Sequence, residues 1–256
     1  MVAPFSREMH VVDCMLHAQS FRTTFLAAFA LLCGAACSQA TPITLPPGLA
    51  PGTEYRILFF TSATQQATSD DISTYNALVT AAANAVPELA ALGVTWTVLG
   101  STAAVNALDN AALDPADTTT QFFNTRGERI AVGVTTPQTG LFGGNFTNHE
   151  NRILDEFGHQ RIAFVFTGTL RSGLADPNSP LGATLVSGGF SNTNSLAWTE
   201  FDWFPQSLNN TSLYGISAPL SSPVPEPDTA SLFVLAAILL IAARRPPSLN
   251  PHRRNK

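Results

Sequence analysis

Cysteine is confined to the start of this 256-residue chain, at Cys14, Cys33 and Cys37. Everything after residue 37 can therefore form no disulfide, no thiolate metal site and no cysteine nucleophile. The stability of that larger part must come from packing.

Charge is also scarce. Asp, Glu, Lys and Arg together make up 12% of the sequence, about half the usual share. Between Thr41 and Pro223 there are six arginines, no lysine and fourteen acidic residues, which gives a net charge of about minus eight. Such a body would repel a phosphate backbone, so we do not expect nucleic acid as a partner.

The motifs of common catalytic sites are missing. The sequence has no G-x-S-x-G, no P-loop and no G-x-G-x-x-G. Before the C-terminal tail the body has only two histidines, His149 and His159, and their ten-residue separation does not fit H-E-x-x-H. We therefore expect no catalytic residue, no metal site and no cofactor.

Two polar segments have residue types that can form ligand sites. The densest ionisable cluster comprises His149, Glu150, Asp155, Glu156 and His159, and we expect a solvated polar segment there. The triplet Asp176-Pro177-Asn178 is similar to the sugar and calcium triplet of lectins, but these residue types favour a turn, and a turn is our prediction.

The N-terminal 40 residues are typical of a secretory signal peptide. The apolar run Leu26–Cys33 follows Arg22, and Ser38-Gln39-Ala40 supplies the small residues that a signal peptidase requires. We expect cleavage between Ala40 and Thr41.

Two further features of this region bear on export. The stretch Met1–Cys14 is polar and too long for a normal signal-peptide start, so we expect translation to begin at Met15. The alternative to cleavage between Ala40 and Thr41 is a lipoprotein that is lipidated at Cys37. A lipoprotein signal would need a branched apolar residue three places before that cysteine, where Gly34 stands.

The first half of the body predicts a strand, a helix and a second strand. The apolar run Tyr55–Thr61 has the composition of a strand buried on both faces. Capping-box spacing at Thr68–Asp71 starts a helix that ends or breaks at Pro87. Alternating apolar residues over Val94–Val98 predict the second strand.

The second half predicts short strands and long loops. Phe122-Phe123 and Ile130–Val134 form a hairpin in which Gly127 supplies a positive φ angle. Ile162–Phe166 and Ser212–Ser217 predict two further strands. A helical half followed by short strands indicates an α+β fold.

Four aromatic residues, Trp198, Phe201, Trp203 and Phe204, allow two interpretations. They form either an exposed platform on which sugar rings stack or part of the core. We favour the core for Trp198 and Phe201, and the spacing does not decide Trp203.

The body resembles the C-type-lectin-like superfold, in its endostatin branch. The matching segments are Trp96 with Gly100-Ser101-Thr102, Phe123-Asn124 with Gly127-Glu128, Phe166–Thr169 with Leu181-Gly182, and Leu213–Ile216. The resemblance implies one body over 54–218, with one main N-terminal helix and several short antiparallel strands. The usual disulfides of that superfold and its Trp-Asn-Asp calcium motif are absent.

The C-terminal tail combines three signals: Val224-Pro225-Glu226-Pro227, the apolar run Ala230–Ala243, and the pair Arg244-Arg245. As a helix the run would cover about 21 Å, short of the roughly 30 Å hydrocarbon core, so snorkelling arginines and a thinned bilayer would be needed. The residues after the run are basic with no acid, which predicts a cytoplasmic end and an outward-facing Glu226.

This order of signals resembles the PEP-CTERM sorting signal of Gram-negative bacteria, also described as the ice-binding protein C-terminal motif. The resemblance implies an exosortase as a transient partner, a cut near Pro225-Glu226-Pro227 and a membrane stop at Arg244-Arg245. The alternative is an ordinary C-terminal membrane anchor.

We expect an exported, non-catalytic bacterial protein of the cell surface or extracellular matrix, anchored in the inner membrane before processing. Signal peptidase and an exosortase are its expected partners, and extracellular polysaccharide is its candidate ligand. A secreted hydrolase with an unrecognised site and a purely structural matrix protein are the alternatives. The expected division is signal peptide 1–40, proline-rich lead-in 41–53, domain 54–218, linker 219–223, sorting signal 224–245 and basic tail 246–256.

Overall fold

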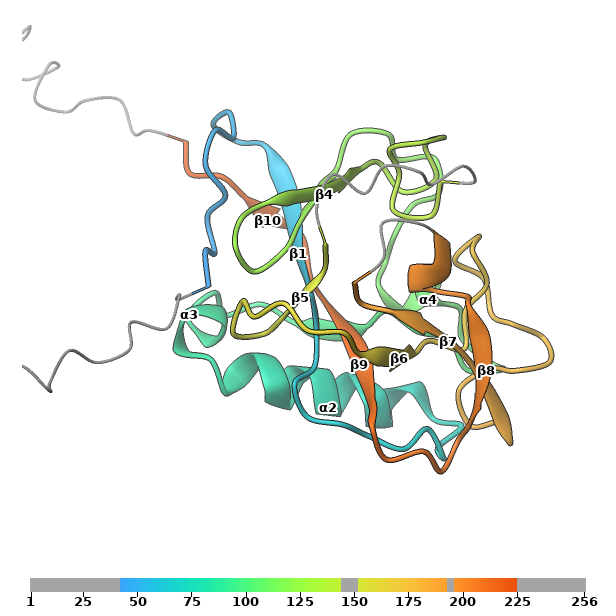
Figure 1. Ribbon diagram of the computed structural model, residues 1–256. Helices are drawn as coiled ribbons and strands as arrows, with labels where there is room; N and C mark the ends of the chain where they lie inside the picture. The colour runs from blue at the N-terminus through green and yellow to red at the C-terminus, as the bar shows by residue number, and fades with distance from the viewer. Residues whose placement is uncertain (1–41, 144–151, 193–195, 225–256) are drawn as a thin grey trace, which may run out of the picture. The chain divides into compact units, whose positions relative to one another are not determined.

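The structure is a computed structural model that describes residues 42–143, 152–192 and 196–224 (Figure 1). The chain divides into two units, Met1–Ala40 and Thr41–Lys256, and every described residue belongs to the second.

Strand β1, Glu54–Phe60, runs through the middle of a ten-stranded mixed sheet. Six of its seven residues are buried, as its near-continuous apolar composition predicts. Along one edge β1 runs parallel to β3 and then to β5, and along the other it runs antiparallel to β10 and then to β9. The partner bounds are Gln121–Phe123 for β3, Leu154–Asp155 for β5, Thr211–Ser217 for β9 and Leu220–Ser221 for β10.

The sheet extends from β1 in both directions, in the order β4-β3-β1-β9-β6-β7-β8. Strand β6 runs parallel to β9, whereas β4 with β3, β7 with β6 and β8 with β7 are antiparallel. The bounds are Trp96–Val98 for β2, which pairs with β9, Arg129–Val132 for β4, Phe164–Phe166 for β6, Leu185–Phe190 for β7 and Asp202–Pro205 for β8. The hairpin of β3 and β4 is as expected, with Gly127 at φ 70°.

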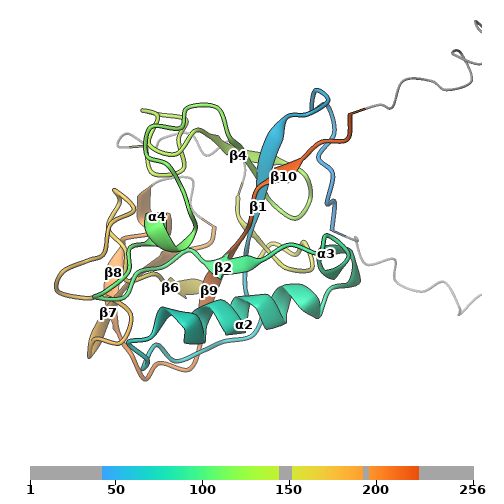
Figure 2. The ribbon, with the colours of Figure 1, turned by 180° about the vertical axis from the view of Figure 1, so that it is seen from behind.

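Helix α2, Ile72–Asn84, lies across one face of the sheet (Figure 2). Its N-cap is Asp71, whose carboxylate accepts a hydrogen bond from the backbone N–H of Ser73 at 2.9 Å. The capping-box spacing predicts Thr68 as the N-cap, so the observed cap lies three residues later in the chain. Short helices follow at Pro87–Ala90 (α3) and Ala107–Asn110 (α4), with a 3-10 turn at Leu196–Trp198 (η1).

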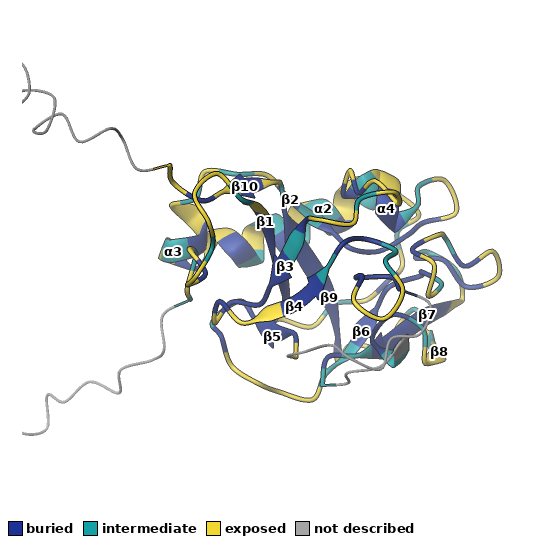
Figure 3. Ribbon diagram, turned by 90° about the horizontal axis from the view of Figure 1, so that it is seen from above, coloured by how far each residue is buried: buried dark blue, intermediate teal, exposed yellow. Residues whose placement is uncertain are grey.

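Strand β1 is coloured as buried along most of its length in Figure 3, and core clusters lie on both of its faces. Ile57 and Phe59 pack with Trp96 on the face covered by α2 and α3. Leu58 and Phe60 point to the opposite face and pack in a second cluster with Trp198. Alternation along a single strand thus supplies both cores.

Arg56 is a buried cation on this central strand. Its guanidinium donates hydrogen bonds to the carbonyl oxygens of Ala111 at 2.7 Å and Ala112 at 2.9 Å, at the C-terminal end of α4. Burial lowers the pKa of Arg56, and the charges of Glu54 and Asp117 oppose that change. Carbonyls at a helix C-terminus carry partial negative charge, so they stabilise this buried cation.

The expected fold class is wrong. We expected an α+β, C-type-lectin-like body of antiparallel strands with a C-terminal transmembrane helix, and the structure is mostly a mixed sheet with few helices. The strands are short, and their apolar composition predicts burial but not direction. None of the helices in the described ranges has the length and apolarity to span a bilayer. The expected span, 230–243, lies outside those ranges.

Replacing the buried cation tests its role in stability. Arg56→Ala should lower the free energy of unfolding by about 3 kcal/mol, because it removes the side-chain donor to the buried carbonyl of Ala111 and opens a cavity. The control is Arg171→Ala, which removes an exposed ion pair to Glu200 and should change stability by less than about 0.5 kcal/mol. Urea denaturation of both variants measures the difference, and equal midpoints would contradict the role.

Candidate functional site

Four phenylalanine rings form a continuous cluster at the β8 end of the sheet. Phe164 contacts Phe190 with ring centroids 4.5 Å apart and Phe204 at 5.1 Å, and Phe190 contacts Phe201 at 4.6 Å. We call this set, Phe164, Phe190, Phe201 and Phe204, the aromatic cluster. It brings together residues from β6, β7, β8 and the segment before β8.

The register of the strands explains the cluster. Phe164 on β6 lies directly opposite Phe190 on β7, and Phe204 on β8 lies opposite Val186. Between them Gly188 has no side chain, and a Cβ there would approach the ring of Phe204 to 3.1 Å. The glycine therefore leaves the space in which the rings meet.

The cluster is only partly covered. Phe201 is 57% exposed, and the other three rings are half-buried. Trp198 is fully buried, so its predicted core position is confirmed, whereas the core prediction for Phe201 is wrong. Trp203 is 58% exposed, and strand alternation directs it to the face opposite Phe204.

Strand β8 ends the series of paired strands, and its backbone is protected. The N–H of Trp203 donates to the carboxylate of Asp202 at 2.8 Å. Pro205, at the end of the strand, has no N–H at all. Because these features oppose the pairing of another strand, the cluster is better suited to a ligand that packs on its side chains.

The polar surroundings of the cluster are acidic. Asp202 is exposed, and Glu200 accepts a hydrogen bond from the backbone N–H of Arg171 at 3.1 Å. The Arg171 side chain lies 3.7 Å from the same carboxylate. The guanidinium of Arg171 is therefore already paired with Glu200. The polar residues beside the aromatic cluster, which we call its rim, would not attract an anionic ligand.

A second candidate site is polar and lies at the carboxyl ends of β1 and β5, which are parallel neighbours. Asp155 and Glu156 are both buried there, so the predicted solvated polar segment is wrong at these residues. Asp155 accepts hydrogen bonds from the backbone N–H groups of Phe157 and His159 at 3.0 and 2.7 Å, and pairs with Arg161 at 3.3 Å. His149 and Glu150 lie outside the described residues.

The side chain of Glu156 binds the loop that follows β1. Its carboxylate accepts hydrogen bonds from the backbone N–H of Ser62 at 2.7 Å and from the Ser62 hydroxyl at 2.5 Å. Burial raises the pKa of Glu156, and the hydrogen bonds from Ser62 oppose the rise. The imidazole of His159 lies 3.5 Å from Asp155. Because the serine and the histidine bind different carboxylates, this geometry does not form a nucleophile and base pair.

The structure brings no metal-binding group together within the described ranges, where no three His, Cys, Asp or Glu side chains converge. Asp176 accepts hydrogen bonds from the backbone N–H groups of Asn178 and Ser179 at 2.9 and 3.2 Å. The predicted turn at this triplet is therefore confirmed.

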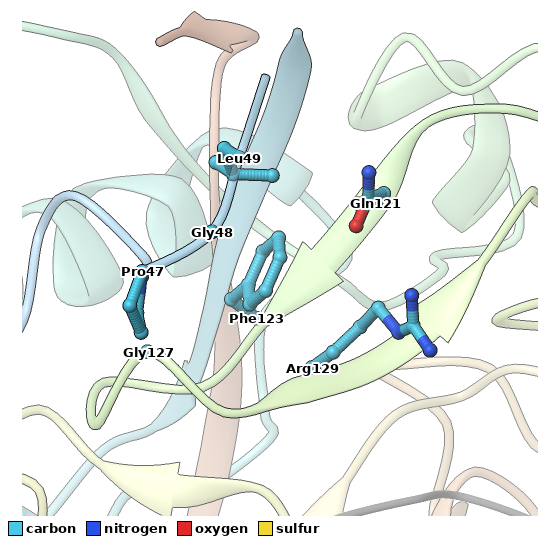
Figure 4. A pocket seen from close by; sticks show the side chains of 7 residues that line it. All are labelled: Pro47, Gly48, Leu49, Gln121, Phe123, Gly127 and Arg129. Atoms are coloured by element: carbon cyan, nitrogen blue, oxygen red, sulfur yellow. The ribbon is translucent and has the colours of Figure 1, made fainter.

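A shallow hollow of about 270 Å³ lies between the N-terminal lead-in and the β3–β4 hairpin (Figure 4). Pro47, Gly48 and Leu49 form one wall, and Phe123 and Arg129 belong to the other. A hollow of this size is at the lower end for a small-molecule site.

Of the predicted processing residues, Val224 alone lies within the described ranges. Val224 is the last described residue and is 67% exposed. The remaining predicted residues lie outside the described ranges: Ala40, Thr41, Pro225, Glu226, Pro227, Arg244 and Arg245.

No protein-family model matches the sequence, and no curated protein matches it significantly.

Glu156 makes stability depend on pH. A carboxyl whose pKa is raised by folding stabilises the folded state fully at low pH and loses that contribution as the pH rises through the raised pKa. Glu156→Gln cannot ionise, so its free energy of unfolding should rise relative to wild type between pH 4 and pH 7. Urea denaturation at both pH values measures this, and a difference that does not change with pH would contradict the burial effect.

Proposed function

We propose that this protein is a non-catalytic, exported component of the bacterial cell surface or matrix that binds neutral polysaccharide through the aromatic cluster. The observation that carries the proposal is the partly exposed set of four phenylalanine rings on a sheet edge whose backbone is protected.

Aromatic rings suit a sugar ligand because their faces pack against the C–H groups of a pyranose ring. Phe201 offers the largest exposed ring of the cluster, and Phe190 and Phe164 continue the apolar surface inward. Each stacked ring contributes on the order of 1 kcal/mol. Several rings along one polymer chain would together give useful affinity.

Charge supports a neutral ligand. The body between Thr41 and Pro223 has a net charge of about minus eight, and Asp202 and Glu200 adjoin the cluster. An acidic polysaccharide would be repelled at this rim. The hydroxyl groups of a neutral sugar could instead donate hydrogen bonds to these carboxylates.

Export and processing are supported by the two ends of the sequence. The run Leu26–Cys33 and the small residues before Thr41 favour signal peptidase cleavage. The order of Val224-Pro225-Glu226-Pro227, an apolar run and Arg244-Arg245 favours recognition by an exosortase, by resemblance.

A pair of aromatic variants tests the binding surface. Full-length protein should bind to insoluble cellulose, and Phe201→Ala should weaken binding about fivefold, because it removes the most exposed ring of the cluster. The matched control is Trp203→Ala, equally exposed but on the opposite face of β8, which should leave binding unchanged. Soluble alginate, an acidic polymer, should not compete. The proposal fails if the Trp203 variant loses binding and the Phe201 variant does not.

Processing is tested separately by intact-mass analysis of the extracellular protein. Wild type should lack residues 1–40 and everything beyond the region of Glu226. Joint replacement of Pro225, Glu226 and Pro227 by alanine should retain the tail, whereas alanine at Pro246 and Pro247 should not. If the triple variant is released without its tail, as wild type is, the processing proposal is wrong.

A further inference from the structure

The point at which the chain leaves the body is fixed by Ser222. Its backbone N–H donates to the carbonyl of Thr53 at 3.0 Å, and its carbonyl accepts from Gly52 at 3.1 Å. Its hydroxyl accepts from the N–H of Thr53 at 3.0 Å and donates to the carbonyl of Ala50 at 2.5 Å. Ser222 is also buried, directly after β10. The tail therefore begins from one defined place on the surface.

The surface around this exit is apolar. The entry strap, which we define as residues 43–49, runs beside it and ends in Leu49, which packs on the core. A hollow of about 290 Å³ is lined by residues 45–49 of the strap together with Ser222 and Pro223. Leu45 is 48% exposed at this hollow, and Ile43 on the strap is exposed as well.

The proposed cut lies close to the exit. Glu226 follows Ser222 by four residues, which span at most about 14 Å when fully extended. A small folded domain is about 30 Å across. As long as Ser222 stays bound, a protease that cuts at Glu226 must therefore work within about 14 Å of the exit, a distance shorter than the width of a small domain.

We infer that the entry strap is a docking surface for the protease that cuts beside Glu226, with Leu45 as its main apolar contact. This inference rests on the proposed processing. The exposed apolar side chains and the adjoining hollow lie where the short tether brings the enzyme. The body thus forms part of the recognised substrate, in addition to the tail motif.

Two leucines of nearly equal exposure allow a matched test. Leu45→Asn in the full-length chain should slow processing about fivefold in a pulse-chase experiment, because it replaces an apolar contact with a polar one. Leu174→Asn, at a position 47% exposed and outside the strap, should process at the wild-type rate. Urea denaturation should show that both variants remain folded.

A spacer separates docking from a defect in folding or export. Eight Gly and Ser residues inserted between Pro223 and Val224 free the cut site from the body, so in this background Leu45→Asn should change the rate less than twofold. A defect that persists with the spacer overturns the inference, as does wild-type processing of Leu45→Asn. If wild type is not cut near Glu226 at all, the processing proposal fails together with the inference. If wild type is cut and Leu45→Asn has no effect, only the inference fails.

Discussion

The structure depends on strand β1 being paired along both edges and buried on both faces. Four strands bond to its seven residues, and they come from segments as far apart as residues 121 and 221. Its alternating side chains build two cores at once. A change in its register by one residue would exchange these cores, so the positions of all the neighbouring strands are fixed by this one.

The same pairing places three polar features of the structure. β10 joins the start of β1 and leads directly into Ser222, so the exit of the chain is tied to the first strand of the fold. Arg56 points from β1 to the end of α4 and holds that helix through two carbonyls. The neighbouring parallel strand β5 delivers Glu156 to the loop that follows β1. Strand β1 therefore connects the buried core to the chain exit at Ser222, to the end of α4 and to the loop that Glu156 binds.

The aromatic cluster lies on β6, β7, β8 and the segment before β8, at one end of the strand order. Gly188 leaves room for the rings, and the bond from Trp203 to Asp202 protects the edge backbone. A surface of this kind exposes apolar area while opposing strand addition. The carboxylate of Asp202 accounts for the second half of this combination, because it occupies the outward N–H of Trp203.

The sequence by itself determined the local elements whose signals are contained within a few residues: the apolar β1, the helix before Pro87, the Gly127 hairpin and the turn at Asp176. It did not determine strand direction, and the short strands at Asp155 and Trp203 were not expected. Only the tertiary structure decided that Asp155 and Glu156 are buried, that Phe201 is exposed and that β1 has parallel partners. The reason is physical: hydrogen bonds between distant segments set direction and burial, and composition records only that an apolar segment must find some partner.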